Sequence, residues 1–403
     1  MNSEILAVGT ELLMGMIANT NAKYISEKLN EIGINVYYHS VVGDNPKRMS
    51  DSFKISMNRA DLIITTGGLG PTEDDLTKEI ISDVLHRELL FNEDIMDSIK
   101  EYFERNKREM TDNNKKQAYM PKGSIIIPNK VGTACGFIIE EGSKIIIMLP
   151  GPPKELQPMF SDTVIPYLRA KTNSAIESMY LKIFGLGEAQ VCDRIKNIIN
   201  EQTDPTIAPY CGTGEVTIRL TTKSGRKILK DKAKEIIEIL GDYVYSEDGS
   251  NLEEVVVDLL KEKGKTIALA ESCTGGMLSS KITNVSGASQ VLNRGIVSYS
   301  NIAKIENLNV PEHILEEYGA VSEQTAEYMA IGVRNVAKTD IGVSVTGIAG
   351  PTGGTKEKPV GLVYIGFSDK EKVIVKKLQL DVDREKIREL ACKNLLDLIR
   401  REV

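Results

Sequence analysis

Short apolar runs alternate with stretches of helical spacing along the first 150 residues. Residues 20–32 place Ile25, Leu29 and Ile32 on one helical face, and residues 46–58 continue in the same manner. The apolar runs that predict strands are Ile5–Val8, Val36–Val42, Asp61–Thr66 and Ile145–Leu149, the last followed by a helix near Lys154. This alternation predicts a parallel sheet with helices on both faces, in a domain covering residues 1–170.

The pattern changes between residues 171 and 248. A strand is expected at Tyr180–Phe184, a helix from Gly187, and a hairpin that pairs Ile207–Cys211 with Val216–Thr222. These elements predict a small α+β module. The turn formers of residues 248–251 precede a new amphipathic helix, so we expect a linker there.

A third domain is expected over residues 250–403. Thr266–Ala270 and Ile341–Val345 are typical of buried strands that run into glycine-rich turns, and Val360–Gly366 adds another strand. The chain ends in a helix with one apolar face, formed by Ile387, Leu390, Ala391, Leu395, Leu398 and Ile399. The sequence therefore predicts an α/β protein of three domains.

Composition limits the possible partners of this chain. Its 403 residues carry a formal net charge of −7, which gives no long-range attraction for nucleic acid or anionic lipid. The longest apolar runs fall far short of the ~18 residues of a membrane span, and no signal peptide is visible. The five cysteines form no CxxC pair, which indicates a reduced, cytoplasmic protein without a zinc site.

The strand expected at 61–66 opens onto a segment that combines glycines with acids. Gly67, Gly68 and Gly70 let backbone N–H groups approach an anion, and Asp74 and Asp75 follow at an expected helix start. Carboxylates at the carboxyl end of a parallel strand hold hard divalent cations, so we expect a phosphate and metal site. Glu11 is a further candidate ligand for the metal. Plain helix capping by the acids is the alternative interpretation.

A possible nucleophile follows the strand expected at 266–270. Ser272 and Cys273 precede Gly275 and Gly276 at a predicted helix start, where N–H groups can stabilise an oxyanion. His313, which is the one histidine of this domain, lies in a polar stretch, so a Ser-His-Asp triad has little support. Lys304 as base and Tyr299 as proton relay are the replacements, and Cys273 is the rival nucleophile. A half-buried tyrosine and a solvated lysine are the structural alternative.

Three motifs of the first domain resemble the CinA family (competence/damage-inducible protein A). They are Val8–Leu13 with Asn19–Asn21, Thr66–Thr77, and Leu149–Glu155. The resemblance implies a molybdopterin-binding-like three-layer α/β fold and a pyrophosphatase that acts on ADP-ribose with Mg, Mn or Co. The implied metal ligands are Asp74, Asp75 and Glu11, and the implied substrate contacts are Thr10, Asn19, Gly67, Gly68 and Gly70. Cys135 departs from the family pattern, where proline is usual.

The rest of the chain carries the same resemblance. The middle segment is similar to the family's KH-like insert but lacks a GxxG clamp, so nucleic-acid binding is not expected, and a homodimer is the family expectation. The matching motifs of the third domain are Ala270–Gly276, Gly287–Ser289, Tyr299–Asn301 with Lys304, Gly319–Ser322, and Thr346–Pro351 with Lys358–Gly361. They resemble nicotinamide-nucleotide amidases, which hydrolyse the carboxamide of nicotinamide mononucleotide to nicotinate mononucleotide and ammonia.

On this resemblance Ser272 attacks the amide, and Lys304 with Tyr299 moves the proton. The implied substrate contacts are Thr274, Gly275, Gly276, Ser289, Thr346, Gly347 and Gly350. Arg384 and Arg388 are the two candidates for holding the substrate phosphate, because the arginine fork suits phosphate oxygens. The amidase needs no cofactor. Two other functions stay open, a molybdopterin-related enzyme and a competence or DNA-damage accessory protein that binds partners.

Overall fold

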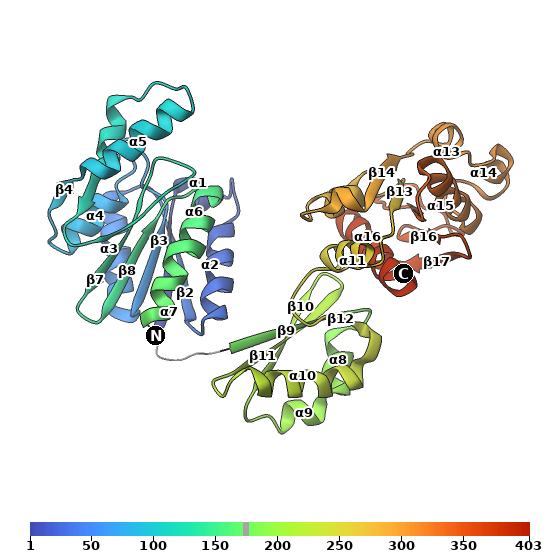
Figure 1. Cartoon of the computed structure of the whole chain (residues 1–403), viewed down its shortest axis with the longest axis horizontal. Coiled ribbons are helices and arrows are strands. Elements are labelled where there is room, and N and C mark those ends of the chain that lie inside the picture. Colours follow the sequence, from blue (N-terminus) through green and yellow to red (C-terminus); the bar gives the residue numbers. More distant parts are fainter. Residues whose placement is uncertain (172–176) are drawn as a thin grey trace. The chain divides into compact units, whose positions relative to one another are not determined.

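The computed structural model describes residues 1–171 and 177–403, arranged in two compact units, Met1–Glu177 and Ser178–Val403 (Figure 1). The middle module and the third domain, which the sequence predicts as separate domains, therefore belong to one compact unit. The expected start of the middle module at 171 borders residues 172–176, which lie outside the described residues.

The first unit is built on a six-stranded sheet. Its strands, in spatial order, are β2 (Asn35–Val42), β1 (Asn2–Val8), β3 (Leu62–Thr66), β8 (Lys144–Leu149), β7 (Gly136–Glu141) and β6 (Ile125–Ile127). The first four are parallel, but β7 is antiparallel to both β8 and β6, so the expectation of a parallel sheet is wrong at this edge. The two residues between β7 and β8 leave room only for a tight hairpin, and Gly142 adopts the positive φ that such a turn favours.

Helices cover both faces of this sheet, as predicted. Alternate residues of each strand face opposite sides, so Ile5 and Leu6 belong to different cores. One core includes α2 (Thr20–Glu31), α6 (Pro153–Met159) and α7 (Ile165–Lys171), and the other includes α3 (Pro46–Arg59), α4 (Thr77–Val84) and α5 (Glu93–Arg105). Smaller elements are α1 (Thr10–Leu13), β4 (Leu89–Phe91), η1 (Asp112–Ala118), β5 (Tyr119–Pro121) and the π-helical turn η2 (Phe160–Val164).

The second unit begins with a four-stranded sheet that carries its own core. The strand order is β10 (Thr206–Gly212), β11 (Glu215–Thr222), β9 (Glu177–Phe184) and β12 (Val244–Ser246). The predicted hairpin is confirmed, with Cys211 opposite Val216. The accompanying helices are α8 (Glu188–Arg194), α9 (Lys196–Asn200), α10 (Arg226–Leu240) and the 3₁₀ turn η3 (Gly241–Tyr243).

The last part of the chain forms a five-stranded sheet. Its order is β14 (Leu292–Val297), β13 (Ile267–Glu271), β15 (Ile341–Gly347), β16 (Leu362–Ser368) and β17 (Val373–Gln379), of which the first three are parallel. The helices are α11 (Leu252–Glu262), α12 (Met277–Thr283), α13 (Asn301–Leu308), α14 (Glu312–Tyr318), α15 (Glu323–Ala337) and α16 (Arg384–Glu402), with η4 at Ala288–Gln290. The carboxyl ends of β13, β14 and β15 meet at one edge, where the candidate nucleophile lies.

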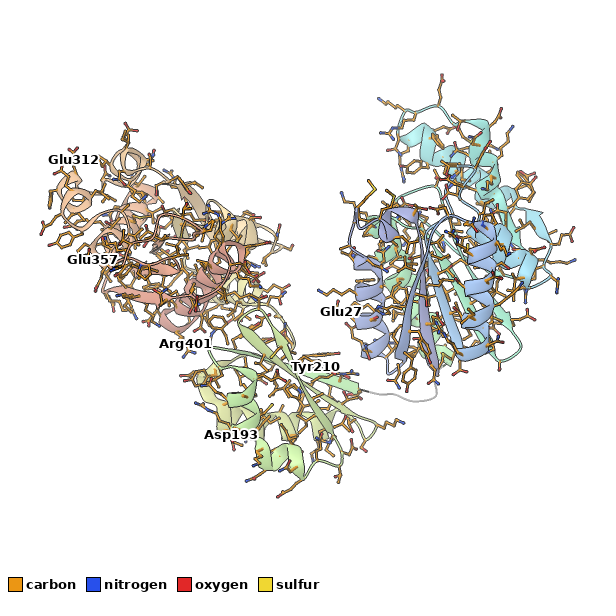
Figure 2. All side chains as sticks on the ribbon, turned by 180° about the vertical axis from the view of Figure 1, so that it is seen from behind. Glu27, Asp193, Tyr210, Glu312, Glu357 and Arg401 are labelled. Atoms are coloured by element: carbon orange, nitrogen blue, oxygen red, sulfur yellow. The ribbon has the colours of Figure 1, made fainter. Side chains whose placement is uncertain are left out.

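The surface carries charged side chains on both units. Figure 2 labels Glu27 of α2, Glu312 of α14 and Glu357 of the loop before β16, all of which are exposed. Among the described residues, we find no helix with the length and apolar character that crossing a membrane requires.

Candidate functional sites

Ser272 lies at a sharp strand-to-helix turn in the second unit. Its N–H donates to Val345 O at 3.0 Å, which fixes the end of β13 against β15. Gly275 (φ +58°) and Gly276 (φ +93°) then reverse the chain into α12. Because positive φ is costly for other residues, these glycines allow the turn to present Ser272 at the edge of the sheet.

Glu271 organises this turn, and the sequence assigned it no role. Its fully buried carboxylate accepts hydrogen bonds from the Thr274 hydroxyl at 2.7 Å, Gly276 N at 3.0 Å, Leu278 N at 3.1 Å and Ser279 N at 2.8 Å. A carboxylate therefore satisfies the first N–H groups of α12. The signal for this role was an acid at the end of a buried strand, directly before a glycine-rich helix start.

Lys304 lies beside the candidate nucleophile. Its side chain is fully buried, and its Nζ is 3.1 Å from Ser272 Oγ, 2.8 Å from Ser298 O and 3.3 Å from Tyr299 O. Burial lowers the pKa of Lys304 to about 8. The alternative of a solvated lysine is wrong, and the structure brings together the nucleophile and base that the sequence predicts.

Tyr299 and Cys273 both line the same pocket but differ from the expectations. The Tyr299 side chain is 65% exposed, and it is the backbone carbonyl that Lys304 contacts. No hydrogen bond joins the Tyr299 hydroxyl to Ser272 or Lys304 among the described residues, so a relay through that hydroxyl is not formed here. Burial raises the pKa of the Cys273 thiol to about 12, which keeps the thiol neutral and makes Cys273 a poor rival to Ser272.

A pocket of about 190 Å³ opens at this edge of the sheet. Its lining consists of Ser272, Cys273, Tyr299, Lys304, Ala320, Val321, Thr346, Gly347, Ala349 and Arg384. The Thr346 hydroxyl donates to Ala320 O at 2.7 Å, and Arg384 Nη1 donates to Gly350 O. Gly350 therefore holds Arg384 through its carbonyl. The sequence did not assign Ala320 or Val321, although both lie within the Gly319–Ser322 motif.

Several predicted substrate contacts lie outside this pocket. Thr274 is fully buried, its carbonyl accepts a 2.7 Å hydrogen bond from Arg388 Nη2, and its neighbour Gly275 donates to Ser272 O. The N–H of Gly276 is bound to Glu271. Arg388 therefore braces the turn, and the N–H groups of Gly275 and Gly276 are already used inside it.

Ser289 is a further correction. It is exposed in η4, directly before the amino end of β14, whereas the pocket lies at the carboxyl ends of β13, β14 and β15. The length of a strand thus separates Ser289 from Ser272 within the domain.

A glycine-rich loop at the carboxyl end of β3 forms the corresponding feature of the first unit. A Cβ at Gly67 would lie 2.2 Å from Val8 O, and a Cβ at Gly68 would lie 2.1 Å from Thr77 Oγ1. Both glycines have positive φ. They let the loop pass between β1 and α4, which no larger residue allows.

A second pocket, of about 310 Å³, lies next to this loop. Its lining consists of Val8, Glu11, Leu12, Ile17, Ala18, Asn19, Thr20, Asn21, Thr66, Gly151, Pro152 and Pro153. Asn19 uses its Oδ1 to cap α2, at 3.0 Å from Ala22 N. Asn21 is 9% exposed, donates to Gly151 O at 2.7 Å, and has a buried Oδ1 without a partner among the described residues. Asn21 lies in the Asn19–Asn21 motif, but the sequence assigned it no role, and its buried Oδ1 is an unpaired acceptor.

The acidic residues form a turn before α4 and not its first turn, because the helix begins at Thr77. Asp75 Oδ2 accepts from Thr72 N at 3.0 Å, a Cβ at Gly70 would lie 2.4 Å from it, and Lys116 Nζ donates to Thr72 O at 3.0 Å. Asp74 is exposed, and a hydrogen bond from Thr72 lowers its carboxyl pKa. The hydroxyl and N–H of Thr10 are bound to Asp44, outside the pocket lining.

The described side chains do not by themselves provide a full set of ligands for a divalent metal. Among residues 1–171 and 177–403, no three His, Cys, Asp or Glu side chains are grouped to hold a metal, so Glu11, Asp74 and Asp75 do not form a three-carboxylate cluster. Mg²⁺ usually binds through one or two carboxylates, with water and substrate phosphates as the other ligands. The exposed Asp74 beside a glycine-rich loop fits a site in which water and substrate phosphates supply most of the ligands.

Together, the fold and the sites define a multidomain α/β protein with a serine–lysine pair in one unit and a glycine-rich loop with an acidic turn in the other. Residues 4–170 match the "Probable molybdopterin binding domain", residues 178–246 the "Damage-inducible protein CinA KH domain", and residues 249–403 the "CinA C-terminal domain". The chain belongs to the CinA family. The family and the order of its domains are confirmed, as are the molybdopterin-binding-like, KH-like and CinA C-terminal folds.

Relatives match over the whole length of the chain. A protein of Acetivibrio thermocellus, provisionally named competence-damage inducible protein, is 53% identical over 100% of this chain and 99% of its own. The CinA-like protein of Dictyoglomus turgidum is 50% identical over 100% of this chain and 99% of its own. Among solved structures, the protein CinA of Thermoplasma acidophilum, described as of unknown function, is 34% identical over 40% of this chain and 95% of its own, with a TM-score of 0.38.

Proposed function

We propose that residues 250–403 form an amidase that hydrolyses the carboxamide of nicotinamide mononucleotide. The observation that carries the proposal is the fully buried Lys304 Nζ at 3.1 Å from Ser272 Oγ, with a pKa of about 8. A lysine with that pKa is partly neutral near physiological pH and can act as a general base. The resemblance of the motifs to nicotinamide-nucleotide amidases supplies the substrate.

The chemistry divides into two steps. Neutral Lys304 takes the proton of Ser272 Oγ as Oγ bonds to the carboxamide carbon, and the carbonyl oxygen becomes an oxyanion. Lys304 then returns that proton to the leaving nitrogen, so ammonia departs and an ester on Ser272 remains. Water attacks the ester, its proton passes through Lys304 to Ser272 Oγ, and the carboxylate product is released. Cys273, the residue after Ser272, lines the pocket, and its N–H is a candidate donor to the oxyanion.

Arg384 supports a nucleotide as the substrate. It begins α16, lines the pocket, and has one guanidinium nitrogen bound to Gly350 O. Its remaining N–H groups suit the phosphate of the substrate, since the guanidinium fork matches phosphate oxygens. In this arrangement the nicotinamide ring would lie against Ser272 and the phosphate near Arg384, both of which line the pocket.

Ammonia release from nicotinamide mononucleotide by the full chain tests this proposal. Ser272→Ala should lower turnover by at least ~10³-fold, because the covalent step is lost. Ser280→Ala, in the neighbouring α12, is the matched control and should retain turnover. Near-normal turnover by Ser272→Ala, or no ammonia from the wild-type chain, would overturn the assignment.

For residues 1–170 we propose a metal-dependent pyrophosphatase acting on ADP-ribose. The observations that favour it are the exposed Asp74 beside the Gly67–Gly70 loop and Asn21, which lines the adjacent pocket and has an unpaired Oδ1. Asp74, with Asp75 and Glu11 as further candidate ligands, would hold a Mg, Mn or Co ion, which would neutralise phosphate charge. Asn21 would accept a hydrogen bond from the nucleotide.

Asp74→Asn should abolish metal-dependent cleavage of ADP-ribose and leave ammonia release intact. Asp112→Asn, which alters an exposed acid paired with Lys115, is the control. Tight molybdopterin binding without ADP-ribose turnover would instead favour a molybdopterin-related enzyme. Partner capture that survives Ser272→Ala combined with Asp74→Asn would favour an accessory protein. A homodimer and a cytoplasmic location stay predictions from the family and the composition.

A further inference from the structure

The final helix, α16, is held from two sides within the second unit. Ile387, Ala391 and Leu395 belong to the core that it shares with the C-terminal sheet. Its polar residues Lys393 and Asp397 are also nearly buried, at 8% and 9% exposure. Buried charges require partners, and for Lys393 the middle module provides most of them.

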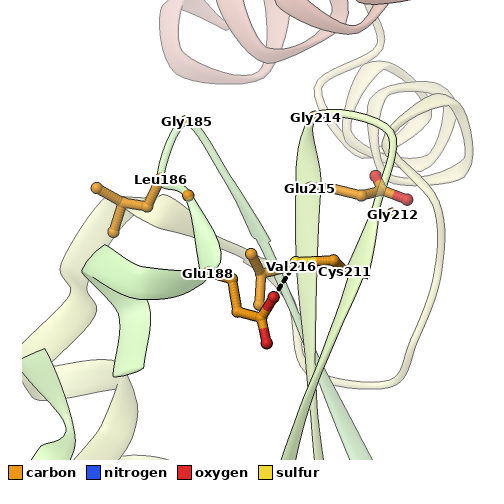
Figure 3. A pocket seen from close by; sticks show the side chains of 9 residues that line it. Gly185, Leu186, Glu188, Cys211, Gly212, Gly214, Glu215 and Val216 are labelled. Atoms are coloured by element: carbon orange, nitrogen blue, oxygen red, sulfur yellow. Dashed lines mark hydrogen bonds between the residues drawn. The ribbon is translucent and has the colours of Figure 1, made fainter. Parts of the chain in front are cut away.

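The tip of the β10–β11 hairpin makes this contact. Lys393 Nζ donates to Thr213 O at 2.8 Å and lies 3.5 Å from Glu215 Oε2, which also accepts from the Tyr245 hydroxyl at 3.1 Å. A Cβ at Gly214 would lie 2.3 Å from Leu390 Cδ2, so the tip fits against the helix without room for a side chain. Figure 3 shows Gly214 and Glu215 at this tip.

A second contact holds the far end of α16. Arg400 Nη2 and Arg401 Nη2 both donate to Asp242 O, at 2.8 Å and 3.1 Å. Lys393 and Arg400 are about 10 Å apart along a helix axis. Two contacts at this separation restrict both sliding and tilting of the helix.

The other end of the same helix reaches the amidase site. Arg384 lines the pocket, and one turn later Arg388 Nη2 binds Thr274 O in the nucleophile turn at 2.7 Å. Lys393 is about 13 Å from Arg384 along the helix axis. Since a packed helix moves as a rigid element, a shift at Lys393 would be transmitted to both arginines.

We propose that the β10–β11 hairpin tip of the middle module is a positioning element of the amidase site. It fixes α16 along its axis, and α16 in turn places Arg384 for the anionic end of the substrate and Arg388 for the turn that carries Ser272. The identity of the substrate rests on the proposed amidase function, whereas the mechanical link does not. The KH-like module thereby acquires a role that involves no nucleic acid.

The test compares Lys393→Met with Lys372→Met in the full chain. Lys372 lies outside α16 and forms an ion pair at 2.6 Å with Glu402 of that helix. Both residues belong to the C-terminal domain, so Lys372→Met removes one ion pair of α16 and leaves the hairpin contact. For Lys393→Met, we expect KM for nicotinamide mononucleotide to rise about 5–20-fold while kcat falls less than about threefold. Amide hydrogen exchange over residues 272–280 and 384–392 should become faster in Lys393→Met and stay unchanged in Lys372→Met.

Glu215→Gln is the second variant, because it preserves shape and guards against misfolding of Lys393→Met. It should shift KM and exchange in the same direction by a smaller factor. Wild-type KM and exchange in both variants would overturn the inference while the amidase function stood. If the wild-type chain released no ammonia, the proposed function would fail, and the exchange result alone would decide the inference: faster exchange in Lys393→Met supports it, and unchanged exchange overturns it.

Discussion

The two candidate sites differ in how much of their chemistry is present before any ligand binds. In the second unit, Lys304 is fully buried against Ser272, and burial alone lowers its pKa to about 8. In the first unit, Asp74 is exposed and no three-ligand metal cluster exists among the described residues. The first kind of site is pre-organised by packing, whereas the second, on the proposed function, would depend on metal and phosphate ligands brought from solution.

The largest effect that this comparison predicts is on the base. Lys304→Met should lower ammonia release from nicotinamide mononucleotide by about 10³-fold or more, because the nucleophile loses its proton acceptor. ADP-ribose cleavage by the same variant, measured in parallel, should match the wild type. Equal loss of both activities would indicate misfolding, and an active Lys304→Met protein would exclude Lys304 as the base.

The next largest effect should come from Glu271. Its buried carboxylate accepts hydrogen bonds from Thr274, Gly276, Leu278 and Ser279, so Glu271→Gln replaces an acceptor with a donor amide at one oxygen. We expect the free energy of unfolding to fall by about 2–4 kcal/mol, as for buried charge-assisted networks. Urea unfolding of the full chain measures this loss, and turnover should fall with it. A fully stable, fully active variant would show that the turn does not need this carboxylate.

The pH dependence of the two activities should differ. Below pH 8, amidase kcat/KM should rise by about tenfold per pH unit. The base must be neutral, and the pKa of Lys304 is about 8, so amidase kcat/KM should rise with pH below 8 and level off above it. Asp74 has a lowered pKa and is already ionised at neutral pH, so ADP-ribose cleavage should lack this limb. Initial rates between pH 6 and about pH 9.5 decide the point. An amidase profile that is flat from pH 6 to 8 would contradict the assigned base.

The smallest effect should follow replacement of the rival nucleophile. Cys273 is buried with a raised thiol pKa of about 12, so Cys273→Ala should lower amidase turnover by less than about fivefold, through packing alone. The same assay that is used for Ser272→Ala measures this change. A loss as large as that of Ser272→Ala would transfer the nucleophile to Cys273.

Much of the architecture and part of the site could be predicted from the chain alone. Strand-turn-helix patterns placed Ser272 and Gly67–Gly70 after buried strands, and both placements hold. Lys304 was predicted from its neighbours in a motif, but its 3.1 Å approach to Ser272 depends on α13 packing beside β13 and on contacts over 32 residues of separation. Sequence spacing carries no information on such a distance.

The errors share a cause. Arg388, Ser289 and the N–H groups of Gly275 and Gly276 are the right kinds of group for substrate binding, yet the fold uses three of them internally and places Ser289 at the opposite strand end. Asn21 was missed for the converse reason, because only burial shows that its Oδ1 lacks a partner. The antiparallel direction of β7 follows from its two-residue connection to β8, because so short a connection can only form a hairpin between two paired strands.

The sequence by itself determined the family, the order of the domains and the position of Ser272 at a strand-to-helix turn, because local periodicity and turn chemistry are properties of adjacent residues. The tertiary structure alone decided which polar groups face the pockets and which are used for packing. It also decided the pKa of Lys304, since desolvation comes from side chains distant in the chain. The contact between Lys393 of α16 and Thr213 at the hairpin tip is of the same kind, as it joins residues 180 positions apart.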